Sequence, residues 1–325
     1  MPSRFFVEPP ITEDTIELVD AEAHHLLHVL RAKTGDVIAL FDGTGREFEG
    51  EVGRLRRSSV EVFVRSHQVV DRESPRKLVV GVALPKGDRQ RWLIEKLVEL
   101  GVAECVPLET SRGVAQPEGG TLEKLRRAVI EASKQCGRNR LMAISTPLAW
   151  SDFVVSAPVD AIRRAAHPPA LWPTSGSHSG ADPRTVPRTT TEDKTDDKTD
   201  DRTNEKANER GQERAPQKAL EKTDEEAKEH TDEGSGETRN TATVARVANR
   251  DSGESLGEFL DAVRLTSPET PVFAAVGPEG GFSADEIATA LHAGWRLVGL
   301  GRRILRIETA AMALATAVIA TCDSQ

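Results

Sequence analysis

The stretch Val276-Gly-Pro-Glu-Gly-Gly-Phe-Ser283 decides the fold, because it carries the chain from a buried strand through a glycine-rich turn into a helix. The apolar run 271–276 before the turn is typical of a strand covered on both faces. Ser283 and Glu286 have the spacing of a capping box, which predicts a helix that begins there and ends at Gly294. A strand, a turn and a helix in this order indicate an α/β fold.

A second glycine-bearing turn lies at Leu300-Gly-Arg-Arg-Ile-Leu-Arg-Ile-Glu-Thr-Ala310, between a predicted strand at 295–300 and a predicted helix at 309–321. We expect the two turns to lie at the ends of adjacent strands and to form a crevice lined by backbone groups. Neither turn has the GxGxxG spacing of a dinucleotide site or the Gly-Lys-Ser/Thr end of a phosphate loop. Glycines without a lysine favour a neutral or zwitterionic ligand, such as an adenosine moiety.

The chain between residue 73 and these turns alternates between strand and helix patterns. Strands are predicted at 78–84, 104–108, 141–145 and 160–166, and helices at 89–100, 121–135 and 256–263. This alternation predicts a parallel sheet with helices on both faces. The predicted α/β domain covers residues 73–325.

Residues 1–72 have a different pattern, with short strands at 15–19, 36–41, 46–52 and 59–65 and one helix at 21–31. Strands at short, regular spacing predict a small β-barrel. Its basic residues could face phosphates or could be ordinary solvated charge, and the sequence leaves both open. His24, His25 and His28 do not form a convincing metal site, because a third ligand at a suitable spacing and a zincin glutamate are missing.

The segment at about 170–255 is predicted to be a disordered insertion in the α/β domain. No aromatic residue occurs from Pro173 to Glu258, and large aliphatic residues are few. Such a segment buries too little apolar surface to offset its ordering entropy. A partner-binding arm is the alternative interpretation. Most of the excess of acidic residues lies here, so the net charge of −9 argues only weakly against nucleic-acid binding by the remainder.

The 325-residue chain has three widely separated cysteines and no CxxC pair, so a disulfide framework is not expected. Its first residues lack the pattern of a signal peptide, and no stretch has the roughly 18 apolar residues of a membrane helix. These features predict a soluble, cytoplasmic protein without a membrane partner.

Several motifs together resemble the RsmE family of 16S rRNA methyltransferases in the SPOUT superfamily. They are the two glycine turns and, in order along the chain, 1–6 (MPSRFF), 24–31 (HHLLHVLR), 86–88 (KGD), 99–101 (ELG) and 135–138 (QCGR). The resemblance covers nearly all of the chain except the insertion. Two positions depart from the family pattern: Ile307 stands where threonine is frequent, and Arg302 where proline is common.

The resemblance implies a SPOUT-type parallel sheet with a C-terminal trefoil knot, a PUA-like N-terminal barrel that binds RNA, and a homodimer. It further implies S-adenosylmethionine as cofactor and methylation of N3 of one uridine in the 16S rRNA of the 30S subunit, with no metal. The implied cofactor-binding residues belong to the two turns: Val276, Gly277, Glu279, Gly280, Gly281, Leu300, Gly301, Ile304, Leu305 and Thr309. The basic residues predicted to bind RNA are Arg4, Arg31, Lys33, Lys86, Arg112 and Arg138.

Catalysis at N3 requires loss of the N3 proton, which leaves negative charge on the ring oxygens. A cation beside these oxygens would stabilise that charge, and Arg306 in the second turn is the predicted residue. Arg4 is predicted to reach the substrate from the barrel or from the other subunit. Glu308 and Glu279 are candidates for the general base, although Glu308 could equally be a carboxylate favoured at a helix N-terminus.

Three other functions remain open at this point. One is a SPOUT methyltransferase that acts on another RNA, such as a tRNA ribose hydroxyl. Another is a catalytically silent RNA-binding assembly factor, which the intact glycines of both turns disfavour. A nucleotide-dependent oxidoreductase is the remotest, because the dinucleotide fingerprint is missing.

Overall fold

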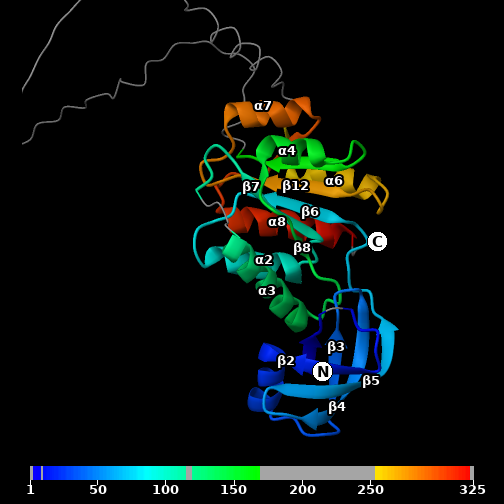
Figure 1. The fold of residues 1–325 in the computed structure, drawn as a ribbon. Helices are drawn as coiled ribbons and strands as arrows, with labels where there is room; N and C mark the ends of the chain where they lie inside the picture. Colours follow the sequence, from blue (N-terminus) through cyan, green and yellow to red (C-terminus); the bar gives the residue numbers. More distant parts are fainter. Residues whose placement is uncertain (1–2, 9, 115–118, 169–252, 323–325) are drawn as a thin grey trace, which may run out of the picture. The chain divides into compact units, whose positions relative to one another are not determined.

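The computed structural model describes residues 3–8, 10–114, 119–168 and 253–322. Nearly all of the predicted insertion at 170–255 lies outside these ranges. The described residues form an N-terminal β domain and an α/β domain, each built around its own sheet (Figure 1). None of the helices in the described ranges is long and apolar enough to span a bilayer.

The N-terminal domain contains a five-stranded sheet in the order β1-β3-β4-β5-β2. Its strands are β1 (Arg4–Phe6), β2 (Thr15–Val19), β3 (Val37–Phe41), β4 (Arg46–Leu55) and β5 (Ser59–Val69). β1 pairs in parallel with β3, and the other pairs are antiparallel. The apolar side chains of alternating strand positions meet in a separate core that includes Phe5, Leu40, Phe48 and Val62, together with Leu26 from the helical segment after β2. This arrangement fits the small β domain expected from the strand spacing.

The helix predicted at 21–31 is split in two. A short α-helix, α1 (Asp20–His24), continues into a π-helical turn, η1 (His25–Val29). The backbone then takes a left-handed conformation at Arg31, with φ of 53°. Residues with a Cβ atom rarely adopt this backbone conformation, and it is incompatible with a right-handed helix, so the helix ends before Arg31. β1 was not predicted, because three residues are too short for an alternation pattern.

The α/β domain contains an eight-stranded sheet. Seven strands follow the order β11-β13-β10-β12-β6-β7-β8, and β9 pairs separately with β7. All of these pairs are parallel, as predicted. The strands are β6 (Leu78–Val82), β7 (Glu104–Glu109), β8 (Ala143–Ile144), β9 (Leu148–Ala149), β10 (Ile162–Ala166), β11 (Gly253–Ser255), β12 (Val272–Val276) and β13 (Arg296–Gly299).

Helices cover both faces of this sheet (Figure 1). On one face, an aliphatic core joins α2 (Arg89–Glu99), α3 (Gly119–Cys136), α6 (Leu256–Leu265) and α8 (Ile307–Cys322). On the other face, an aromatic-rich core joins α4 (Trp150–Ser156) and α7 (Ala284–His292). The predicted helices are all present, whereas α4 was missed because its seven residues are too few to show a helical period.

Candidate functional site

A pocket lies at the carboxyl ends of β10, β12 and β13, where the two glycine turns meet. The sequence predicted that the strands before these turns are adjacent, and this prediction is wrong. β10 lies between β12 and β13 and pairs with both. Its continuation, His167 and Pro168, therefore forms a third wall of the pocket. Strand order depends on crossovers between distant segments, which no local pattern encodes.

Two glycines give the turns their shape. Gly281 has a φ of +69° and donates its backbone N–H to the Pro278 carbonyl at 2.7 Å, which closes the first turn. Gly301 has a φ of +109° at the start of the second turn. Both conformations are strained for residues that carry a Cβ atom. The glycines at these positions are thus explained by the backbone that the pocket requires.

Aromatic packing fixes the first turn to the aromatic-rich face of the sheet. Phe282 is buried, and the centroid of its ring lies 4.2 Å from the centroid of the Trp150 ring of α4. The Trp150 indole donates to the Glu286 carbonyl at 2.8 Å, while Ser283 and Glu286 form the predicted capping box at the start of α7. The turn is therefore held at its exit by a buried ring and a capped helix.

Most of the residues predicted to bind the cofactor line this pocket: Val276, Gly277, Glu279, Gly281, Leu300, Gly301, Ile304 and Leu305. Gly280 instead packs beside Arg112, and Thr309 is exposed on α8; neither lines the pocket. The lining residues that were not predicted are Ala166, His167, Pro168, Pro278, Arg303, Ile307 and Ala310. A signal for the first three was available, because the predicted strand at 160–166 ends at this point.

Two carboxylates next to the pocket share one guanidinium. Arg89 of α2 donates to Glu279 at 3.1 Å and lies 3.5 Å from Glu308. The hydrogen bond to Glu279 raises the pKa of Arg89, and the charge of Glu308 adds to this rise. The side chain of Glu308 is only 9% exposed, and its Oε2 has no hydrogen-bond partner among the described residues. Arg89 therefore links the first turn to the start of α8.

The second turn also carries exposed positive charge. Arg302, Arg303 and Arg306 are exposed, and their guanidinium groups have no hydrogen-bond or ion-pair partner within the part of the chain that is described. Arg303 lines the pocket itself. Lys86, in the loop after β6, is likewise exposed. These cations are available to a ligand that approaches the pocket.

The other residues predicted to bind RNA occupy different places. Arg112 donates to the Gly280 carbonyl at 2.6 Å, so part of its guanidinium supports the first turn. Arg31 and Lys33 are exposed on the N-terminal domain, beyond the π-helical turn. Both side chains are therefore accessible to a ligand.

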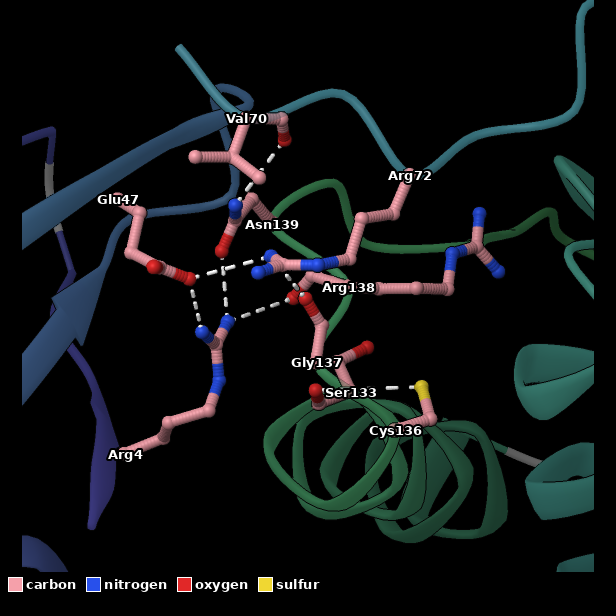
Figure 2. Close-up of polar contacts among 9 residues, drawn as sticks. All are labelled: Arg4, Glu47, Val70, Arg72, Ser133, Cys136, Gly137, Arg138 and Asn139. Atoms are coloured by element: carbon pink, nitrogen blue, oxygen red, sulfur yellow. Dashed lines mark hydrogen bonds and ion pairs between the residues drawn. The ribbon is translucent and has the colours of Figure 1, made fainter. Parts of the chain in front are cut away.

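Arg4 and Arg138 do not line the pocket. They lie where the N-terminal domain contacts the α/β domain (Figure 2). The Arg4 guanidinium pairs with Glu47 and donates to the Asn139 side chain at 2.6 Å and to the Arg138 carbonyl at 3.2 Å. The Arg138 side chain points away from this group, and it is buried. It donates to the carbonyls of Val98 and Val102, both at 3.0 Å, and pairs with Glu73.

This placement does not support the prediction that Arg138 binds RNA, because its guanidinium is buried and already donates to two carbonyls and to the Glu73 carboxylate. We call the set of Arg4, Glu47, Arg72 and residues 137–140 the joint.

Within the described residues, no group of three or more His, Cys, Asp or Glu side chains is positioned to hold a metal ion.

Comparison with known proteins identifies both domains. A family model described as an RNA methyltransferase domain matches residues 72–177 and 202–319. A second model, an RNA methyltransferase PUA domain, matches residues 18–64. Together the two matches cover the α/β sheet and the N-terminal sheet except for β1 and parts of β2 and β5.

Curated relatives carry the name ribosomal RNA small subunit methyltransferase E. The Synechocystis protein is 25% identical over 311 residues, which cover 95% of this chain and 75% of the relative. The Bacillus subtilis protein is 30% identical over 148 residues, which cover 42% of this chain and 57% of the relative. Among solved structures, the enzyme of that name from Neisseria gonorrhoeae, bound to S-adenosyl methionine, has a TM-score of 0.64 at 22% identity, with coverage of 98% and 96%. This last likeness concerns the fold.

Proposed function

The chain belongs to the RNA methyltransferase family, and on this premise we propose that it transfers the methyl group of S-adenosylmethionine to N3 of one uridine in 16S rRNA. The observation that carries the proposal is the pocket at the ends of β10, β12 and β13, which gathers residues of both glycine turns. The names of the curated relatives support small-subunit rRNA as the substrate.

The pocket residues fit the cofactor. Gly277, Gly281 and Gly301 line the pocket without side chains, so their backbone forms its wall, and Leu300, Leu305 and Ile307 supply apolar walls. This combination suits an adenosine group, because apolar surface takes the ring and backbone groups take its polar edge. When bound, the cofactor supplies the electrophilic methyl group.

We assign charge stabilisation to Arg306. Arg306 does not line the pocket itself, but it stands between Leu305 and Ile307, which do. It is exposed and its guanidinium has no partner among the described residues, so it is free to contact the uracil. Loss of the N3 proton places negative charge on the uracil oxygens, and this charge persists until the N3–methyl bond forms. A preorganised cation at these oxygens lowers the barrier.

We assign removal of the N3 proton to the pair Glu279 and Glu308. Glu279 lines the pocket, whereas Glu308 is buried beside it with one oxygen unpartnered among the described residues. Arg89 contacts both carboxylates. The proton passes to one of these two carboxylates. The variants Glu279→Gln and Glu308→Gln distinguish them. The general base is the residue whose substitution abolishes the fall of the methyl-transfer rate at acidic pH.

RNA contacts are proposed for Arg31 and Lys33 on the PUA-type domain, for Lys86 in the loop after β6, and for Arg112 at the first turn. We further propose the domain limits 1–72 and 73–325, the trefoil knot and the homodimer. A second copy is supported by Trp92 of α2, a large aromatic side chain that is 44% exposed on a helix that packs against α8.

The decisive experiment incubates the purified protein with radiolabelled S-adenosylmethionine and 30S subunits that lack the modification, followed by mass spectrometry of the rRNA. We expect label on N3 of one uridine, lost in Arg306→Ala. Arg302→Ala is the matched control, since Arg302 is an exposed arginine of the same turn to which we assign no contact with the uracil. Cofactor binding without label on 16S rRNA would favour another RNA substrate, and absence of cofactor binding would favour a silent assembly factor.

A further inference from the structure

The joint connects the two domains through a centre of largely enclosed polar groups, with Arg72 and Arg140 at its exposed edge. The side chain of Arg4, on β1, is 12% exposed, and that of Glu47, on β4, is 17% exposed. Asn139, just after α3, is 1% exposed. Charged groups are rarely enclosed unless they are paired and hydrogen-bonded, so their contacts determine how the domains meet.

Three hydrogen bonds connect Asn139 to the N-terminal domain. Its side-chain oxygen accepts from Arg4 at 2.6 Å, and its side-chain nitrogen donates to the Val70 carbonyl at 3.1 Å. Its backbone carbonyl accepts from Gly45 at 3.1 Å. A single residue of the α/β domain is thus bonded to β1, to the turn before β4 and to the residue that follows β5. Figure 2 shows its contacts with Arg4 and Val70.

The residues beside Asn139 in the chain are held by contacts to both domains. Arg72 bridges Glu47 at 3.1 Å and the Gly137 carbonyl at 2.9 Å. Arg138 reaches in the opposite direction, to the end of α2. Residues 137–140 are therefore fixed from both sides, and the orientation of one domain follows that of the other.

We propose that Arg4 is a positioning residue for methyl transfer, which acts by holding the RNA-binding domain at a fixed orientation to the pocket. This inference rests on the proposed function. It replaces a direct catalytic role for Arg4, because its guanidinium is enclosed by Glu47, Asn139 and the Arg138 carbonyl. RNA that contacts both domains presents its target base correctly only when their relative orientation is fixed, and displacement by about 1 Å can cost on the order of 10²-fold in rate.

The test compares Arg4→Ala with Asn139→Ala and Glu47→Gln, which leave the Arg4 guanidinium in the chain. All three variants are expected to lower the single-turnover rate on 30S subunits roughly tenfold to hundredfold, with the dissociation constant for S-adenosylmethionine unchanged within about twofold. Glu51→Gln is the matched control, because Glu51 of β4 pairs with Arg65 at the exposed surface of the same domain. It should retain the wild-type rate.

A covalent tether provides a second, independent measurement. Thr44 and Arg140 form an antiparallel bridge across the joint, and such partners have Cα atoms about 4.5–5.5 Å apart, within the reach of a disulfide. Thr44→Cys with Arg140→Cys in the Arg4→Ala background should recover most of the rate when oxidised and lose it when reduced.

The proposal would be overturned if Asn139→Ala and Glu47→Gln kept the wild-type rate, whatever the effect of Arg4→Ala, or if the formed disulfide gave no rescue. The wild-type protein is assayed in parallel. Absence of methyl transfer by the wild type refutes the proposed function, whereas wild-type activity with unaffected joint variants refutes only the positioning role.

Discussion

The pocket and the joint use the same residue type in opposite ways. At the pocket, Arg302, Arg303 and Arg306 are exposed and lack partners among the described residues. At the joint, Arg4 and Arg138 are enclosed, and their guanidinium groups bind carboxylates and carbonyls. The difference indicates that an arginine in an RNA-modifying protein is a candidate for chemistry only when its donors are not already used. Each prediction below tests this contrast, from the largest expected effect to the smallest.

The largest effect is expected from Arg138→Ala at the joint. The substitution removes two hydrogen bonds to buried carbonyls and the partner of Glu73. Loss of one member of a buried, hydrogen-bonded ion pair typically costs about 3–5 kcal/mol in the free energy of unfolding. Urea titration measures this loss. Arg302→Ala, the exposed counterpart, should change the free energy by less than about 0.5 kcal/mol. Equal effects of the two substitutions would contradict the contrast.

Arg306→Ala should have the reverse profile. We expect the rate of methyl transfer to fall about 10²–10³-fold, the size seen when one preorganised group that stabilises developing charge is removed. The free energy of unfolding should remain within about 0.5 kcal/mol of wild type, because an exposed side chain without a partner is lost. Single-turnover rates and urea titrations on the same preparations check both parts. A large loss of stability in this variant would show that Arg306 is structural.

Much of the fold could be predicted from the sequence, because it depends on local patterns. The parallel sheet followed from alternating apolar runs, and α7 followed from the capping pair Ser283 and Glu286. The resemblance to the RsmE family is confirmed by the domain match and by the names of the relatives. Most of the pocket residues were also predicted, because glycines in a turn after a strand indicate a backbone conformation that other residues rarely adopt.

The remaining features depend on contacts between distant segments. The position of β10 between β12 and β13, which brings His167 to the pocket, is a matter of strand order. Arg138 was predicted to bind RNA because a basic residue after a helix resembles an exposed one in sequence. Its acceptors, the carbonyls of Val98 and Val102, lie about 40 residues away along the chain. The network around Arg4 likewise joins residues of β1, β4 and the segment after α3.

A smaller effect is expected at the backbone of the pocket. Gly281→Ala places a Cβ atom on a residue with a φ of +69°, which costs about 1–2 kcal/mol. Gly280→Ala is the matched control, since Gly280 lacks a positive φ and its added Cβ would meet only the flexible Arg112 side chain, at 3.3 Å. Calorimetry with S-adenosylmethionine and urea titration should show weaker binding and lower stability for Gly281→Ala alone. A loss confined to Gly280→Ala would refute this account of the turn.

The smallest effect is the pH dependence of the joint. Burial of the Glu47 carboxylate opposes its ionisation, but hydrogen bonds from Arg4 and Arg72 outweigh burial, so the pKa of Glu47 is lower in the folded protein than in the unfolded chain. A lowered pKa contributes stability that is complete above the pKa of the unfolded chain and disappears as pH falls through the folded value. The gap in unfolding free energy between wild type and Glu47→Gln should therefore be widest near neutral pH and should narrow in acid. Glu51→Gln, at an exposed pair, should show a smaller gap throughout. If the Glu47→Gln gap stayed constant between neutral and acidic pH, the charge of Glu47 would not contribute to the joint, and its hydrogen bonds alone would account for the contact.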